Sequence, residues 1–270
     1  MKQSIRSISD IQAMKQTGEK ITVLTAYDAS ITKHLEMADV EVILVGDSLG
    51  MVVQGHDSTL PVTIDDMIYH SQIVARARER ALLITDMPYH SYTSAKEALC
   101  NARRLRDEGL TDMVKLEGAG SVLEAVKRIV EAGIPVCGHL GLLPQSIEKL
   151  GGYKVQGREQ VAADKMVDDA LALQASGAAM IVVECIPSIL GRRISEAVDI
   201  PIIGIGAGPD CDGQVLVIYD LLGLTPGKRP KFSKDFLSEM PAGKGITDAI
   251  RAYVKAVKSV EFPAAEHGFN

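Results

Sequence analysis

The sequence has no tryptophan, few other aromatic residues, no excess of basic charge and no long apolar run. Aromatic residues make up 4% of the 270 positions, and the formal net charge at pH 7 is −6. Basic and aromatic side chains do not cluster, so a nucleic-acid partner is not expected. Every uninterrupted apolar segment is well short of the roughly 18 residues that a membrane span requires, so we expect no membrane partner either.

Cysteine is scarce and never closely paired along the chain. The four cysteines, Cys100, Cys137, Cys185 and Cys211, form no CxxC motif, which argues against a tetrahedral zinc site. Buried free thiols are typical of a reducing compartment. The first 16 residues are polar and lack the apolar stretch of a secretory signal. We therefore expect a cytoplasmic location.

The chain does contain a series of short apolar runs rich in β-branched residues. These runs are strongly apolar rather than alternating, which is typical of parallel strands buried on both faces. Eight of them occur, at 21–27, 40–46, 82–88, 113–118, 134–141, 181–186, 200–208 and 214–220.

Helical patterns separate most of these runs. Apolar positions at helical spacing, followed by glycine, predict helices over 94–109, 121–133 and 165–177. In the second of these, Ser121, Glu124 and Gly133 have the spacing of a capping box and a closing glycine. The segment 233–260 also has a helical pattern, most clearly over 246–260. Strands that alternate with helices predict a parallel sheet.

Eight repeats of strand and helix predict an α/β fold, a (β/α)8 TIM barrel, as a single domain over residues 1–270 with N-terminal and C-terminal helical extensions. A doubly wound open sheet is the alternative. Only residues 209–213 separate the last two runs, so either a helix is missing there or 214–220 is not the eighth strand. The polar, glycine-rich insertion 142–164 is expected to form a loop over the barrel mouth.

Polar residues follow the apolar part of most predicted strands. Because barrel enzymes place their catalytic groups at the carboxyl ends of the strands, these side chains are expected around one volume. Lys115 and Glu117 are two residues apart and therefore share a face of one strand. An ordinary role as turn former, helix cap or ion pair is available to each residue alone. Their joint occurrence favours a site, made of Asp47, Asp86, Lys115, Glu117, His139 and Glu184.

These residue types limit the chemistry. Carboxylates without cysteine or paired histidine favour Mg²⁺ over Zn²⁺, and such a metal polarises carbonyl groups. Lys115 as the Schiff-base lysine of an aldolase is an alternative, which the neighbouring acids disfavour. The glycine-rich segment 204–208 lies where many barrels bind phosphate, although it has neither the GxGxxG nor the Walker A pattern.

Five longer segments have an unusual composition: VGDSLGMVVQGHDSTLPVT (45–63), VCGHLGLLPQS (136–146), GGYKVQG (151–157), VVECIP (182–187) and IPIIGIGAG (200–208). They resemble the ketopantoate hydroxymethyltransferase family, within a similarity that extends from TAYD (25–28) to PKF (230–232).

The resemblance implies a barrel of the phosphoenolpyruvate/pyruvate-binding type that requires Mg²⁺. It implies transfer of a hydroxymethyl group from 5,10-methylenetetrahydrofolate to 3-methyl-2-oxobutanoate, giving ketopantoate (2-dehydropantoate) and tetrahydrofolate in pantothenate biosynthesis. It further implies a cytoplasmic homo-oligomer, typically a decamer of two five-membered rings.

The resemblance also assigns roles to the residues at the strand ends. It implies that Asp47 and Asp86 bind the metal and contact the substrate, and that Glu117 belongs to the metal's surroundings. Substrate contact is implied for Ser48, Lys115 and His139, and the role of proton acceptor is implied for Glu184. Asp86 lies in TDMPYHSYTS (85–94), where only the aspartate and the proline support the match. The motifs do not identify the folate-binding residues.

Two other functions remain open at this point. A Mg²⁺-dependent, enolate-forming lyase or mutase of the phosphoenolpyruvate mutase/isocitrate lyase type would share the metal carboxylates but need no folate. A non-catalytic barrel that binds a small anion and regulates a partner would show no metal-dependent turnover.

Overall fold

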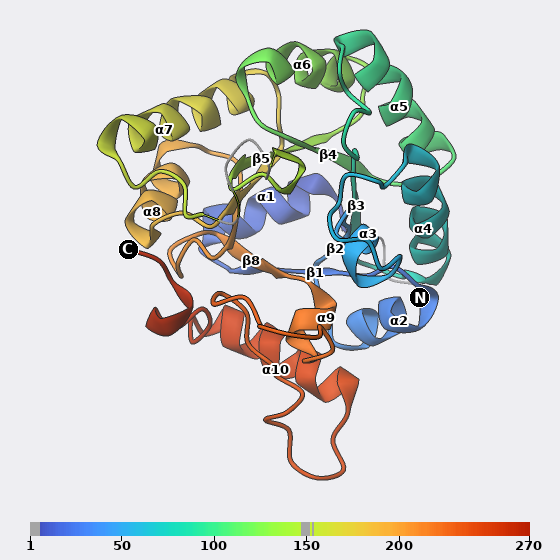
Figure 1. Cartoon of the computed structure of the whole chain (residues 1–270), viewed down its shortest axis with the longest axis vertical. Helices are drawn as coiled ribbons and strands as arrows, with labels where there is room; N and C mark the ends of the chain where they lie inside the picture. Colours follow the sequence, from blue (N-terminus) through green and yellow to red (C-terminus); the bar gives the residue numbers. More distant parts are fainter. Residues whose placement is uncertain (1–5, 147–151, 153) are drawn as a thin grey trace.

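The structure, a computed structural model, describes residues 6–146, 152 and 154–270. Within these residues, eight parallel strands follow one another in chain order, and β1 pairs directly with β8 to close a barrel (Figure 1). The predicted (β/α)8 barrel is therefore confirmed, and the open-sheet alternative is excluded. The strands are β1 (Ile21–Thr25), β2 (Val42–Val45), β3 (Leu82–Asp86), β4 (Met113–Glu117), β5 (Val136–Gly141), β6 (Met180–Glu184), β7 (Ile202–Ile205) and β8 (Gly213–Leu216).

Helices surround the barrel, and none of those in the described part of the chain is long and apolar enough to cross a membrane. The outer ring consists of α2 (Ala29–Met37), α4 (Ile64–Ala77), α5 (Ala95–Asp107), α6 (Leu123–Glu131), α7 (Gln160–Ala175), α8 (Ser188–Ala197) and α10 (Ile246–Lys258). Shorter turns are α3 (Leu49–Val52), α9 (Ile218–Leu221), η1 (Gly120–Val122), η2 (Pro144–Ser146) and η3 (Ala265–His267).

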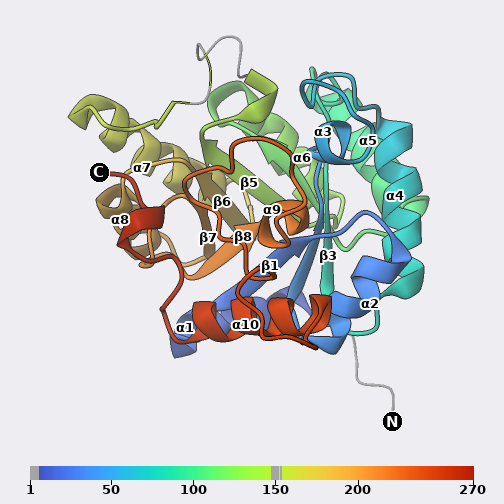
Figure 2. The same ribbon diagram turned by 60° about the horizontal axis from the view of Figure 1, so that its bottom comes forward.

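Two apolar layers hold this arrangement together. One lies between the strands and the outer helices, and the other fills the inside of the barrel. Ile11 of α1 (Ile8–Thr17) belongs to the inner layer together with Ile21 and Met180 at the amino ends of their strands. Helix α1 thus covers the amino end of the barrel, below the strands in Figure 2, and leaves the carboxyl ends for the site.

The link between β7 and β8, all of it described, contains no helix. This confirms the first of the two alternatives for this region. The last predicted run is a strand only up to Leu216, after which the chain enters α9. Helix α10 packs against α2 and β1, and Tyr253 lies with its hydroxyl oxygen 3.1 Å from the carbonyl oxygen of Val23 and 2.8 Å from that of Gln214. The C-terminal helix therefore covers the β1–β8 seam.

Other element boundaries differ from the predictions. Val122 is the N-cap of α6, because Ser121 lies inside the η1 turn instead of the extended conformation that a cap requires, so the predicted capping box is wrong. Gly133 does close this helix, with φ +75°. Helix α10 spans only part of 233–260, since turns containing Pro241 and Gly243 occupy 233–245. Helix α7 begins at Gln160, so the insertion is shorter than predicted; its residues 147–151 and 153 lie outside the described part.

Candidate active site

On four neighbouring strands, β3 to β6, the inward-facing row changes from apolar to ionisable toward its carboxyl end. On β3 the row runs from Leu82 and Ile84, which belong to the inner apolar layer, to Asp86. Because side chains alternate between the two faces of a strand, every second residue points into the barrel. Rows with the same change end in Lys115 and Glu117 on β4, His139 on β5 and Glu184 on β6. The predicted convergence therefore follows from strand geometry.

Lys115 and Asp86 form a buried ion pair across the β3–β4 register. The Lys115 Nζ and Asp86 Oδ1 atoms are 2.5 Å apart, and the two side chains are 6% and 5% exposed. Burial opposes the charge on Lys115, but Asp86, Asp47 and Glu117 outweigh it and raise the pKa of the ammonium group. Lys115 therefore stays protonated, which suits anion binding and argues against a Schiff-base role.

His139 lies between two carboxylates on neighbouring strands. Its Nδ1 is 3.4 Å from Glu117 Oε1, and its Nε2 is 3.2 Å from Glu184 Oε2. No group within the described residues forms an aligned hydrogen bond with either ring nitrogen. Burial and Lys115 disfavour protonation, yet the two carboxylates prevail and raise the pKa of His139 to about 9. An imidazolium between two acids can hold an anion or move a proton.

Asp47 follows β2 and faces the same volume. Its backbone N–H donates to Asp86 Oδ2 at 3.0 Å, and its Oδ2 accepts a hydrogen bond from Gln145 Nε2 at 2.8 Å. Burial, Asp86 and Glu117 raise the pKa of the Asp47 carboxyl well above its usual range, while Lys115 and Gln145 oppose this rise. Adjacent buried acids of this kind favour binding of a cation.

Ser48 continues the site on the β1 side. Its Oγ is 2.9 Å from the hydroxyl oxygen of buried Tyr27. A Cβ at Gly46 would lie 2.9 Å from the same Oγ, so a larger residue would displace Ser48. Asp28, which follows β1, is not part of this group. Its side chain accepts a hydrogen bond from Ile31 N and caps α2.

The backbone beside Glu184 is tightly constrained. Cys185 has φ +48°, a left-handed conformation that is uncommon for residues other than glycine. Its N–H donates to Ile205 O at 2.9 Å and its carbonyl accepts from Gln156 N at 2.9 Å. Leu142 N donates to the Glu184 carbonyl at 2.8 Å. Strained conformations of this kind persist where surrounding contacts hold them, often at functional sites.

The glycine-rich turn 204–208 is filled by the chain itself. A Cβ at Gly206 would lie 3.0 Å from the Phe269 ring and 3.1 Å from Phe232. The N–H of Ser188, at the start of α8, donates to Phe269 O at 2.9 Å. The C-terminal segment therefore occupies the place where other barrels bind phosphate.

The sequence of this chain is similar to that of a known protein family over nearly its full length. A sequence model described as ketopantoate hydroxymethyltransferase matches residues 6–265. The chain belongs to this family. It is 55% identical over 264 residues to the 3-methyl-2-oxobutanoate hydroxymethyltransferase of Alkalilimnicola ehrlichii, covering 97% of this chain and 94% of the relative. It is 54% identical over 260 residues to the Nitrosococcus oceani protein of the same name, covering 96% and 97%. This family member is therefore an enzyme, a hydroxymethyltransferase.

Solved structures with the same fold are much more distant in sequence. A phosphonopyruvate hydrolase superposes with a TM-score of 0.62 at 13% identity, over 94% of this chain and 99% of that one. A 2,3-dimethylmalate lyase of the PEP mutase/isocitrate lyase superfamily gives a TM-score of 0.57 at 13% identity, over 80% and 82%. The family member thus shares its barrel type with this superfamily.

Sequence reasoning missed two residues of the site, Gln145 and Tyr92. Gln145 is 6% exposed, and its Oε1 is 2.5 Å from the Tyr92 hydroxyl oxygen. Both residues come from loops and neither is charged at neutral pH, so a search of strand ends for ionisable groups overlooked them. Gln145 does lie in the segment VCGHLGLLPQS, whose similarity to the family was the available signal.

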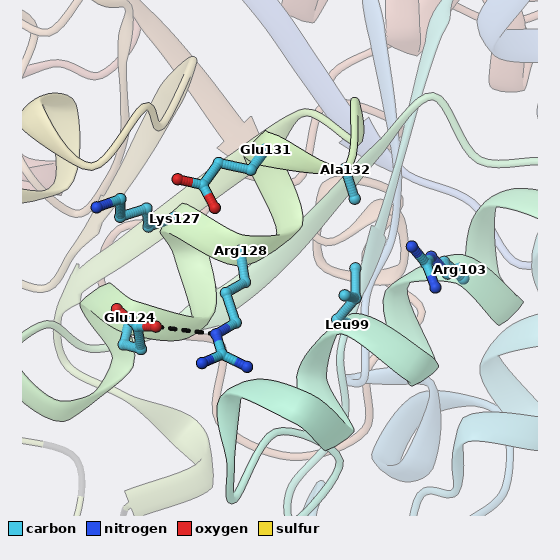
Figure 3. Close-up of a pocket in the computed structure, with 7 residues that line it drawn as sticks. All are labelled: Leu99, Arg103, Glu124, Lys127, Arg128, Glu131 and Ala132. Carbon is cyan, nitrogen blue, oxygen red and sulfur yellow. Dashed lines mark hydrogen bonds and ion pairs between the residues drawn. The ribbon is translucent and has the colours of Figure 1, made fainter.

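A hollow on the outer surface is separate from these residues. It lies between α5 and α6 and is lined by residues of both helices, among them Leu99, Arg103 and the Glu124–Arg128 ion pair (Figure 3). None of the predicted site residues lines it. The strand ends remain the candidate active site of this family member.

Proposed function

We propose that this enzyme transfers a hydroxymethyl group from 5,10-methylenetetrahydrofolate to 3-methyl-2-oxobutanoate and so forms ketopantoate for pantothenate biosynthesis. The names of relatives that are 51–55% identical support this substrate. The observation that carries the proposal is the buried array Glu117–His139–Glu184 beside the Lys115–Asp86 pair. The array combines positively charged side chains, which can bind an anion, with a carboxylate that is placed to accept a proton.

Mg²⁺ fits the oxygen donors of this array. In the part of the chain that the structure describes, no three His, Cys, Asp or Glu side chains form a ready-made metal site. However, Mg²⁺ in proteins usually takes one or two carboxylates and completes its shell with waters and substrate oxygens. Asp47 and Asp86, joined by a 3.0 Å hydrogen bond, would hold it, with Glu117 nearby. When bound, Mg²⁺ supplies Lewis-acid polarisation of the keto group.

Three side chains would bind and orient the keto acid. Lys115 keeps its positive charge and so can attract the substrate carboxylate. His139 lies one strand away and can donate a hydrogen bond to a substrate oxygen from either ring nitrogen when protonated. Ser48, held by Tyr27, offers a hydroxyl at the β2 end. Together they would fix the carboxylate and keto oxygens of 3-methyl-2-oxobutanoate.

Glu184 would remove the proton from C3 of the keto acid. Its side chain is 14% exposed, compared with 3–4% for His139 and Glu117, so it is the most accessible member of the array. The resulting enolate carbon would form a bond to the methylene carbon of the folate, and water would supply the hydroxyl oxygen. Both carbon–nitrogen bonds of that methylene group would break, and the two nitrogens would take up the C3 proton and a proton of the water as tetrahydrofolate leaves. Lys115 and protonated His139 would stabilise the developing negative charge.

The assembly and location that the family resemblance implies also belong to this proposal. We expect a cytoplasmic homodecamer with no membrane or nucleic-acid partner. Analytical ultracentrifugation of the purified protein tests the decamer directly. A sedimentation mass near that of one 29.0 kDa chain would contradict it.

The decisive assay follows ketopantoate formation from 3-methyl-2-oxobutanoate. Reactions with both Mg²⁺ and 5,10-methylenetetrahydrofolate should form product, whereas excess EDTA or omission of the folate should abolish it. Metal-dependent consumption of a keto acid or phosphonate without folate would instead favour a lyase or mutase, the kind of enzyme found among the structural neighbours. Folded protein that forms no product under any condition would overturn the proposal.

A further inference from the structure

Gln145 connects two of the carboxylates expected around the metal. It lies in η2, on the loop between β5 and α7, and its side chain is buried. Its Nε2 donates to Asp47 Oδ2 at 2.8 Å and to the carbonyl oxygen of Met87 at 3.0 Å. Its backbone N–H donates to Glu117 Oε2 at 3.2 Å. A single residue from outside the strands thus contacts both acids.

Tyr92 holds the oxygen end of the Gln145 amide, whose NH₂ end faces Asp47. The Tyr92 hydroxyl donates to Gln145 Oε1 at 2.5 Å and accepts from Glu117 N at 3.4 Å. If the amide were flipped, Oε1 would face the Asp47 carboxylate and the Met87 carbonyl, which can only accept hydrogen bonds. Both contacts would be lost, so the network permits one orientation.

This network has a specific effect on Asp47. Its carboxylate is buried among Asp86 and Glu117, where a donor is needed to offset the crowding of negative charge. The Gln145 amide is a neutral donor, so it fixes the rotation of the carboxylate without neutralising it as a lysine would. A carboxylate held in this way is oriented before its ligand arrives.

We propose that Gln145 is a positioning residue that orients Asp47 for a divalent cation and the keto acid, and that Tyr92 acts through Gln145. This inference rests on the proposed function. It assigns to the η2 turn a role in ligand binding that the strand-end residues do not provide.

The test measures cation binding to the purified enzyme without turnover. Mn²⁺ serves as a paramagnetic probe of the Mg²⁺ site, and its free concentration is followed by electron paramagnetic resonance with and without 3-methyl-2-oxobutanoate. Gln145→Met keeps the side-chain volume but removes the donor. We expect its Kd for Mn²⁺ to rise about 10- to 100-fold, the usual effect of losing a partner that orients a metal ligand.

Tyr92→Phe and the double variant separate positioning from packing. Tyr92→Phe should raise the Kd about 2- to 10-fold, since it removes one hydrogen bond from the amide. Because Tyr92 acts through Gln145, the double variant should bind Mn²⁺ about as weakly as Gln145→Met alone. A role in packing alone would lower the melting temperature and leave the Kd unchanged.

Matched surface controls complete the design. Gln160→Met removes a similar amide–carboxylate bond, 2.7 Å long to Asp164, from the exposed start of α7. Tyr69→Phe removes a hydroxyl from a tyrosine that is 62% exposed. Both variants should bind Mn²⁺ like the wild type.

Distinct results overturn the inference and the proposed function. Wild-type and Gln145→Met enzymes that form ketopantoate and bind Mn²⁺ within about twofold of one another would overturn the inference alone. The inference would also be overturned if the Kd for Mn²⁺ of the double variant rose by the product of the two single-variant increases. Wild-type enzyme that binds neither Mn²⁺ nor the keto acid would overturn both. If Gln145→Met does not fold, Tyr92→Phe decides, and an unchanged Kd overturns the inference.

Discussion

Gly141 on β5 lies against the backbone of Glu184 on β6. A Cβ at Gly141 would be 2.2 Å from the Glu184 carbonyl oxygen, and the residue has φ +92°. Gly141→Ala should therefore push the β6 end away and displace the Glu184 side chain. We expect a loss of more than about 2 kcal/mol in the free energy of unfolding, measured by urea denaturation. Turnover should fall by at least tenfold.

Gly133→Ala is the matched control for this prediction. Gly133 also has a left-handed conformation, with φ +75°, but apart from its sequence neighbours no described atom lies within 4 Å of a Cβ built there. The free energy of unfolding of Gly133→Ala should fall by about 1 kcal/mol, the conformational cost alone, and its turnover should be unchanged. Equal behaviour of the two variants would show that the contact with Glu184 is unimportant.

Glu184→Gln tests the proton acceptor. The amide keeps the size of the side chain beside His139 but cannot accept the C3 proton. The kcat should fall by about 10²- to 10⁴-fold, while calorimetric binding of the keto acid with Mg²⁺ stays close to that of the wild type. Glu124→Gln, on the exposed face of α6, is the control and should be fully active. Near-normal turnover in Glu184→Gln would show that another group is the base.

Asp47→Ala tests the metal role of the residue after β2. Removal of one of two carboxylates should weaken Mg²⁺-dependent binding of the keto acid by at least about 100-fold, as measured by calorimetry. Asp57→Ala, an exposed aspartate ten residues farther along, should bind normally. An unchanged affinity in Asp47→Ala would contradict the assignment of this residue as a ligand.

Lys115→Met tests the buried ion pair. Without Lys115, the Asp86 carboxylate would remain buried beside Asp47 with no cation at 2.5 Å. We expect the free energy of unfolding in EDTA to fall by about 3–5 kcal/mol, because an uncompensated buried charge is costly. Lys165→Met breaks a surface pair with Asp169, 2.6 Å long, and should leave the melting temperature nearly unchanged. Similar effects of both substitutions would rule out a special contribution of the buried pair.

The cysteines should differ sharply in reactivity. All four lie in the described part of the chain, and only Cys100 is exposed. Burial raises the pKa of the Cys137 and Cys211 thiols to about 12, so they hold little thiolate at pH 8. Ellman's reagent should therefore titrate one thiol per native chain, and none in Cys100→Ser. Rapid reaction of several thiols in native protein would contradict the buried positions.

The strand-end side chains could be predicted because a strand has a simple period. Once β3 and β4 are recognised, Asp86, Lys115 and Glu117 must face the barrel interior, because every second residue of a strand lies on the same face as the inner apolar side chains. The same rule places His139 and Glu184. Their roles in catalysis and metal binding are not determined by this geometry and stay predictions.

The loop contributions could not be predicted in this way. Gln145 reaches Asp47 across 98 positions of the sequence, and Tyr92 reaches Gln145 across 53. Such contacts depend on backbone turns that have no repeating pattern. The capping error at Ser121 has the same origin, because a single 3₁₀ turn moved the N-cap by one residue, to Val122.

The cover over the β1–β8 seam has a consequence during translation. Most outer helices are synthesised next to the strands they cover, but Tyr253, which contacts both sides of this seam, follows β1 by more than 200 positions. A ribosome-bound chain that has not yet reached Ile246 would leave outward-facing apolar side chains of this seam, such as Leu24, without the helix that packs against β1. Chaperones and proteases recognise such surfaces. Helix α10 therefore makes full burial of the first strand depend on a segment that is synthesised more than 200 positions later.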